Sequence, residues 1–165
     1  MRDGAYNLGP VSKDYTISLD TTAPTQTVTI TEIIDDKAPW TGTVNDGGVT
    51  NDDTPTLNGT LNAKLAAGET VVIYRDGSYL ETATVNADGL SWTYTDKGLQ
   101  DGTTYVYTAY VRDGAYNLGP VSKDYTISLD TTAPTQTVTI TEIIDDKAPW
   151  TGTVKDGGVT NDDTP

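Results

Sequence analysis

The residues that could do chemistry in this chain are almost all aspartates. The sequence holds 24 acidic residues against 10 basic ones, a formal net charge of −14, and it has no histidine and no cysteine. Without those two residue types, histidine-dependent nucleophilic catalysis, haem ligation and ordinary zinc or copper sites are excluded. The negative charge also argues against binding to nucleic acid or to an anionic membrane surface. The chemistry that remains is that of carboxylate oxygens, which bind hard cations such as Ca²⁺.

Two groups of these residues are placed so that each group could share a cation. The first joins a loop, Asp113–Asn117, to the segment that ends at Asp20. The second consists of two adjacent pairs of aspartates, whose four carboxylates would repel one another strongly unless a cation offset them. We expect calcium at both, because it takes about 6–8 oxygen ligands in less strict geometry than magnesium. The expected ligands are Asp20, Asp88, Asp113, Asn117 and, at the next junction, Asp130 in the first group, and Asp35, Asp36, Asp52 and Asp53 in the second.

Each of these aspartates also has a simpler interpretation. Aspartate caps turns through its side-chain oxygens, and acidic residues keep a surface soluble. The segment Asp46–Leu57 is not an EF-hand, because Leu57 stands where that loop requires glutamate. Turn capping and calcium binding therefore remain open alternatives for each position.

The elements that must position these residues are expected to be β-strands. Aspartate outnumbers glutamate 20 to 4, and aspartate favours turns whereas glutamate favours helices. Alternating apolar and polar residues, separated by turn signals such as Asp76-Gly77, predict seven strands: residues 27–33, 54–61, 70–74, 79–85, 90–95, 103–111 and 121–129. Short strands at this spacing are typical of an Ig-like sandwich. We therefore predict an all-β, Ig-like Greek-key β-sandwich of about seven strands.

One segment of the predicted sandwich carries a more specific signal. Asp101 is followed by Tyr105 four residues later and by Tyr107 two residues beyond. This is the spacing of a tyrosine corner, so we expect the Tyr105 hydroxyl to bond to upstream backbone. Tyr107 would then occupy the position at which antibody domains place their second cysteine. The alternative is an ordinary strand rich in aromatic residues.

The chain repeats itself with an offset of 110 residues. Residues 2–55 recur as residues 112–165 with one difference, Asn45 against Lys155. The natural unit is therefore a tandem module of about 110 residues. Pro24 marks the expected linker, because proline has no N–H to give to a sheet; the alternative is an edge strand and a different phase. We expect the end of a preceding module in residues 1–20, linkers in 21–25 and 131–135, a complete module in 26–130, and the start of a following module in 136–165.

Four motifs occur in register along this repeat. They are Gly89-Leu90-Ser91-Trp92-Thr93-Tyr94, Leu99 to Tyr105, Arg112-Asp113-Gly114-Ala115-Tyr116-Asn117 and Asp130-Thr131-Thr132-Ala133-Pro134-Thr135. Together they resemble the tandem bacterial Ig-like repeats of giant cell-surface adhesins, which include biofilm-associated and type I-secreted RTX adhesins. The resemblance implies an extracellular, calcium-stiffened spacer on the bacterial surface. One departure is Tyr116, where such repeats more often have glycine.

Our functional hypothesis is a structural extender that supports cell adhesion or biofilm formation. Its partners would be identical neighbouring modules of the same chain, with strand exchange possible between the end segments of neighbouring molecules, and neither nucleic acid nor membrane insertion is expected. We do not expect an enzyme, because the carboxylates fall in turns of a small module rather than in a cleft. One alternative is a lectin-like or protein-binding surface module acting multivalently, which would need an exposed aromatic cluster or groove; Trp40 and Trp92 are the tryptophans considered for that role. A third is an accessory domain of a secreted hydrolase.

Overall fold

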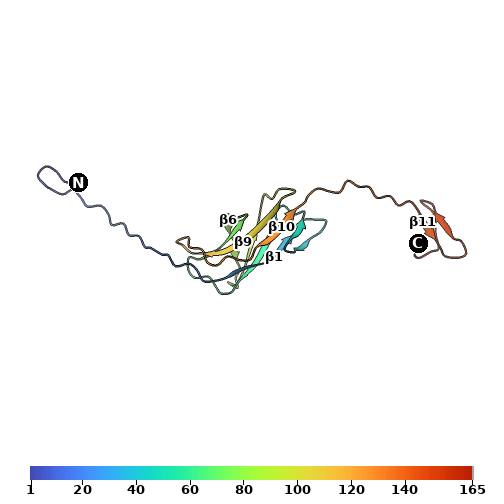
Figure 1. Ribbon diagram of the computed structural model, residues 1–165, viewed down its shortest axis with the longest axis horizontal. Coiled ribbons are helices and arrows are strands. Elements are labelled where there is room, and N and C mark those ends of the chain that lie inside the picture. Colours follow the sequence, from blue (N-terminus) through green and yellow to red (C-terminus); the bar gives the residue numbers. More distant parts are fainter. Residues whose placement is uncertain (165) are drawn as a thin grey trace. The chain divides into compact units, whose positions relative to one another are not determined.

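The protein is described by a computed structural model that covers residues 1–164. Within it the chain forms two separate units, one from Met1 to Thr131 and one from Thr132 onward. In the first unit, strands lie in two five-stranded sheets (Figure 1). This confirms the predicted all-β, Ig-like sandwich. Among the described residues there is no helix long and apolar enough to cross a bilayer.

Each of the two sheets of the first unit contains five of its ten strands. The first sheet has the order β2-β1-β4-β8-β7 and consists of β1 (Val28–Asp35), β2 (Gly42–Val44), β4 (Thr56–Leu61), β7 (Thr84–Val85) and β8 (Ser91–Thr95). The second has the order β3-β10-β9-β5-β6 and consists of β3 (Gly48–Thr50), β5 (Thr70–Arg75), β6 (Ser78–Thr82), β9 (Thr104–Arg112) and β10 (Tyr125–Leu129). All pairings are antiparallel except that of β3 with β10, which is parallel.

The strand count exceeds the predicted seven because one predicted strand is divided in two and two further short strands occur between β1 and β4. The predicted strand 79–85 is divided at Ala83, a buried residue. Ala83 follows β6, which lies in one sheet, and precedes β7, which lies in the other. The segment between β1 and β4, for which no strand is predicted, contains two strands, β2 and β3, one in each sheet. β10 is shorter than predicted, because its first expected residues, 121–124, lie outside the strand.

The core between the sheets is built from the inward faces of alternating strands. Ile33 and Leu57 from one sheet meet Ile73, Tyr107 and Ile127 from the other in a single apolar cluster, and each of these side chains is fully buried.

Trp92 is buried in this core against a glycine on the neighbouring strand. Gly59 is its register partner across β4 and β8. A Cβ atom at position 59 would overlap both the Trp92 ring and the Thr29 carbonyl oxygen. Gly59 is therefore required by close packing, and a glycine in a strand interior often marks such a close approach.

The hairpin predicted at Asp76-Gly77 has the expected geometry. Both residues have positive φ, +53° and +74°, and they form the two-residue loop between β5 and β6. This is the conformation of a type I′ turn, whose twist matches that of the flanking strands.

β1 and β10 run in the same direction along the sandwich. β1 ends at Asp35, whose carboxylate accepts a hydrogen bond from Thr50, and Thr50 is also the register partner of Leu129 at the end of β10. We call this the distal end, and the end at which β1 begins, beside Leu61, the proximal end. The chain therefore enters the module at one end and leaves it at the other (Figure 1). Residues 20–27 and 130–135 carry no strand, so Pro24 does not lie in an edge strand.

Among its described residues, 132–164, the second unit contains one short hairpin. β11 (Ile143–Asp145) pairs with β12 (Gly152–Val154). The pairing repeats that of β1 with β2 one repeat earlier: Ile143 faces Val154 as Ile33 faces Val44.

Candidate functional site

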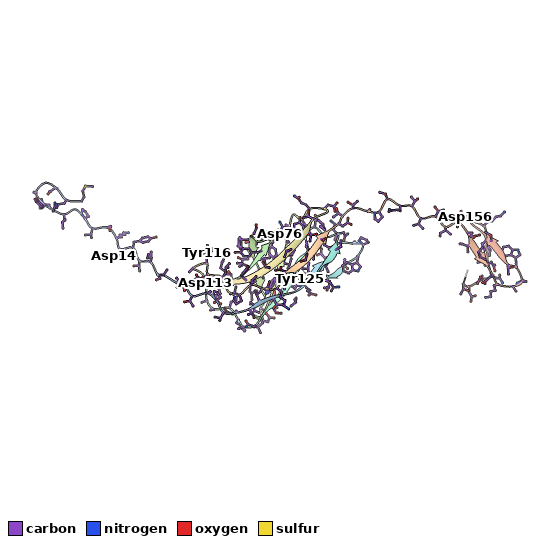
Figure 2. The ribbon with its side chains drawn as sticks, in the orientation of Figure 1. Asp14, Asp76, Asp113, Tyr116, Tyr125 and Asp156 are labelled. Atoms are coloured by element: carbon purple, nitrogen blue, oxygen red, sulfur yellow. The ribbon has the colours of Figure 1, made fainter. Side chains whose placement is uncertain are left out.

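The loop after β9 closes on the carboxylate of Asp113. One oxygen, Oδ1, accepts hydrogen bonds from the backbone N–H groups of Ala115 at 2.9 Å and Asn117 at 2.8 Å. The other, Oδ2, accepts one from Asn117 Nδ2 at 2.9 Å. The bonds from Asn117, its side-chain amide foremost, hold the pKa of Asp113 below its usual range. Figure 2 shows this loop, with Asp113 and Tyr116, at one end of the sandwich.

The incoming segment reaches the same loop. Asn117 Nδ2 also donates to the backbone carbonyl of Asp20 at 3.1 Å. Pro24 is buried, and its carbonyl leaves no room for a Cβ atom at Gly119. The structure thus brings together Asp20, Asp113 and Asn117, as the topology of a sandwich predicts.

The two other aspartates of the first predicted group lie outside the Asp113 loop, Asp88 at the same end of the sandwich and Asp130 at the opposite end, where the next junction is expected. Asp88 is in the turn before β8, at the proximal end, and its carboxylate caps that turn by accepting from Leu90 N, Ser91 N and Ser91 Oγ at 2.8–2.9 Å. The hydrogen bond from the backbone N–H of Leu90 contributes most to lowering the pKa of Asp88. Asp130 follows β10 at the distal end, where its N–H donates to Thr50 O at 2.9 Å.

Tyr116 adopts a left-handed backbone conformation within the Asp113 loop. Its φ is +69°, and the same loop in residues 2–8 places Tyr6 at +68°. Glycine is the residue that adopts such a φ at no steric cost. The Tyr116 ring packs under the Arg112 guanidinium, 4.8 Å from the ring centroid. The loop forms twice from the same residues, so local sequence is sufficient to specify it.

At the distal end the four predicted aspartates belong to one hydrogen-bonded region, in which the carboxylates of Asp35, Asp52 and Asp53 each have partners of their own. Asp35 and Asp52 are buried, with 1% of their surface exposed. Asp35 accepts from Thr50 Oγ1 at 2.6 Å and Lys37 N at 2.8 Å. Asp52 accepts from Asp36 N, Thr54 N and Thr54 Oγ1 at 2.9–3.2 Å. These bonds replace the hydration that the two carboxylates lose on burial.

The remaining two aspartates of the distal group are exposed. Asp53 forms an ion pair with Lys37 at 2.7 Å, and its pKa is lowered chiefly by the hydrogen bond from Lys37. Asp36 contributes its backbone N–H to the network. The same arrangement recurs in the second unit, where Thr160 donates to Asp145 at 2.6 Å and Lys147 pairs with Asp163 at 2.8 Å.

At both ends, the N–H and hydroxyl groups that donate to the carboxylates are those expected for turn capping. Within residues 1–164, no three acidic side chains are arranged so that they could hold one metal ion. Asp113 and the buried Asp35 and Asp52 direct their oxygens at N–H or hydroxyl groups of their own neighbourhood. Calcium binding at these positions stays a prediction.

A buried polar network that sequence reasoning missed joins the two sheets. Asp96, which is 2% exposed, follows β8. Its Oδ2 accepts from Tyr107 Oη at 2.6 Å and from Arg75 Nη1 at 2.8 Å, both in the opposite sheet. Burial, followed by the hydrogen bond to Asp96, raises the pKa of Tyr107. The available signal was Tyr107 itself, since a buried tyrosine hydroxyl needs a partner.

The tyrosine corner is present as predicted. The backbone N–H of Gln100 donates to Tyr105 Oη at 2.7 Å, and both Tyr105 and Tyr107 are buried in β9. The Arg75 guanidinium lies 5.0 Å from the Tyr105 ring centroid, so the corner and the inter-sheet network share one arginine.

An aromatic cluster covers part of the outer face of the second sheet. Tyr74 makes edge contacts with Tyr79 and Tyr110, with centroids 5.8 and 5.1 Å apart. Tyr79 is 44% exposed, and Arg112 lies over its ring at 5.3 Å. Sequence reasoning singled out the tryptophans instead, of which Trp92 is buried in the core and Trp40 is about half exposed.

The sequence profile of the bacterial Ig-like domain matches residues 15–131. The chain belongs to this family. Bacterial Ig-like domains are typically non-catalytic β-sandwich modules, and they commonly occur in extracellular and surface proteins. A comparison with curated proteins returns no match to the chain. The matched region spans the end of the preceding segment, the linker and the whole of the sandwich, so the bacterial Ig-like domain includes both ends of the module described above.

Proposed function

We propose that this bacterial Ig-like domain is an extender module of a bacterial surface adhesin, which holds an adhesive region away from the cell. The observation that carries the proposal is the position of the chain ends, at opposite ends of the sandwich. Modules joined in this way follow one another end to end, and the near-identity of the two copies of residues 2–55 and 112–165 supplies the repetition that a rod requires.

Each module would add a fixed length to such a rod. β9 contains nine residues, which at ~3.4 Å per residue span about 30 Å. The test is small-angle scattering from chains with two, four and six copies of the 110-residue repeat. We expect the maximum dimension to rise in proportion to the number of copies. A dimension that grows only as the square root of that number, as for flexibly joined modules, would contradict a rod.

Calcium binding at the junctions is a separate part of the proposal. It is supported by the acidic residues near both ends, Asp20 and Asp113 at one and Asp35, Asp36 and Asp130 at the other. Binding to the folded state alone would stabilise it by mass action. We expect a higher melting temperature in millimolar Ca²⁺ than in chelator, and a smaller increase in Asp113→Asn. Equal melting temperatures in Mg²⁺ and Ca²⁺ would indicate charge screening rather than a site.

A binding module is a second candidate, favoured by the exposed tyrosine cluster. Flat aromatic side chains at a surface are suited to stacking against apolar faces of ligands such as sugars. A glycan array probed with the intact chain and with Tyr79→Ala separates the two functions. Binding that is lost in this variant would support the second candidate. A spacer gives no specific signal from either protein.

A further inference from the structure

Arg112, the last residue of β9, is a cation that no carboxylate of the module neutralises. Among residues 1–164, the ion pairs of the first unit join Lys37 to Asp53 and Arg75 to Asp96, and neither includes Arg112. The chain has 24 acidic residues, yet in the described part of it none lies within ion-pair distance of this guanidinium. Arg112 is thus available to pair with an anion from outside.

The carboxylates that neighbour Arg112 in sequence and in register are held by other groups. Asp113 accepts hydrogen bonds from the N–H groups of its own loop. Glu69 precedes the register partner of Arg112 in β5, and its Oε2 accepts a hydrogen bond from Gln26 Nε2 at 2.6 Å. Neither carboxylate is directed at the guanidinium.

Two tyrosine rings hold the Arg112 guanidinium in place. Its central carbon lies 5.3 Å from the ring centroid of Tyr79 and 4.8 Å from that of Tyr116. The pairing with Tyr116 recurs between Arg2 and Tyr6, at 4.1 Å, so the local sequence is sufficient to form it. Rings cover the faces of a guanidinium, whereas its five N–H donors lie in its plane and stay available to an acceptor.

The tyrosine cluster described above continues this surface across the outer face of the sheet. One of its roles is structural: Val72 is fully buried although it faces away from the core, and its register partner in β9 is Tyr110. Shielding Val72 does not account for the rings beside Arg112. Tyr79 and Tyr116 remain 44% and 74% exposed, so aromatic surface is open to solvent on either side of the cation in the sequence.

We propose that Arg112 and the exposed rings beside it bind a sugar that carries a carboxylate. The guanidinium pairs with the carboxylate through two parallel N–H donors, the geometry that arginine favours. The exposed ring of Tyr79 stacks against the apolar face of the sugar. The unpaired cation makes the surface selective for acidic sugars over neutral ones, because only an acidic sugar satisfies it. This inference deepens the second candidate function, the binding module, and rests on it.

The first test is an NMR titration of the full-length chain, in chelator, with trigalacturonic acid and with its methyl ester. The two probes share one sugar backbone and differ in the charge of the carboxyl groups. The amide signals of Tyr79 and Tyr110 report on this surface alone, because residues 2–8 contain no counterpart of either. We expect saturable shifts with the acid and at least about tenfold weaker binding of the ester.

The outcomes separate this inference from the function on which it rests. Equal binding of the acid and the ester would overturn the proposal and leave the binding module standing. Absence of shifts with both probes, in a chain that binds neutral sugars on the glycan array, would also overturn the proposal alone. A chain that binds no sugar in either experiment would overturn both.

Variants of the cation distinguish a site from general charge attraction. We expect Arg112→Gln to weaken binding of trigalacturonic acid by at least about tenfold, and Arg112→Lys to weaken it less, since the charge stays and the planar fork is lost. Lys97→Gln makes the same change of charge at an exposed position after β8, at the distal end, and should bind as the parent chain does. Equal losses in Arg112→Gln and Lys97→Gln would overturn the proposal. A hexaglutamate peptide that competes as well as the sugar would assign the surface to acidic peptides and would overturn it too.

Discussion

Tyr116 is held in a backbone conformation that favours glycine. A non-glycine residue at φ +69° is disfavoured by about 1 kcal/mol or more. We therefore expect Tyr116→Gly to be more stable than Tyr116→Ala by about 1 kcal/mol, because both remove the ring and only one removes the strain. Urea unfolding of the two variants measures this difference. At Ala115, which has no positive φ, Ala115→Gly should instead lower stability, and a stabilising effect there would contradict the explanation.

Gly59 fixes the position of Trp92 in the core. A methyl group at this position meets both the indole ring and a backbone carbonyl, so neither neighbour offers an easy way to relax. We expect Gly59→Ala to lower the free energy of unfolding by about 3 kcal/mol, at the upper end of overpacking effects. Gly114→Ala is the control, since that position has open space and no positive φ, and it should change stability by less than about 0.5 kcal/mol. Similar losses from both variants would contradict the packing argument.

At the scale of elements, the two sheets are joined by the bonds from Tyr107 and Arg75 to Asp96. The pKa of Tyr107 is raised in the folded protein, so above about pH 10 the unfolded state releases this proton first. The unfolded state then binds fewer protons, and stability falls as pH rises, by at most about 1.4 kcal/mol per pH unit for one group. We expect Tyr107→Phe to be less stable at pH 7, by about 2 kcal/mol, and to show a shallower decline above pH 10. Unfolding measured from pH 7 to 11 tests both, and the exposed Tyr6→Phe should retain the full slope.

The sequence predicts those strands whose pattern is set by burial on one face. β4, β8 and β9 alternate inward and outward residues over five or more positions, and each lies within a residue or two of its expected range. β2 and β3 could not be predicted, because three-residue strands rich in glycine form only where a neighbouring strand offers pairing. The division at Ala83 has the same cause: the sheet that each half joins depends on distant partners.

The candidate site was predictable in its placement but not in its chemistry. That Asp20 lies beside the Asp113 loop follows from the order of strands in an Ig-like sandwich. The Asp113 carboxylate points at the N–H groups of its own loop because of the left-handed turn at Tyr116. Asp35 and Asp52 are buried with Thr50 lying between them. The spacing of residues along the chain reveals neither arrangement.

At the scale of the whole molecule, the repeat provides an internal control for the distal network. Thr50→Val removes the hydroxyl that donates to the buried Asp35, and leaving that carboxylate under-satisfied should cost about 2 kcal/mol. The same change at Thr160, in the second unit, should leave the melting temperature of the sandwich unchanged. Calorimetry of the two variants measures this contrast. A sandwich that melts equally early in Thr160→Val would mean that the two units do not unfold independently.

The common direction of β1 and β10 determines how the module would resist being pulled. Tension between its two ends acts along both strands, outward from the beginning of one and the end of the other. Hydrogen bonds between strands lie across the strand direction, so the ladders of β1 with β4 and of β10 with β9 are loaded in shear. Many bonds then share the force at once, instead of opening one after another as in an unzipping hairpin. A surface anchor under flow meets this same direction of load.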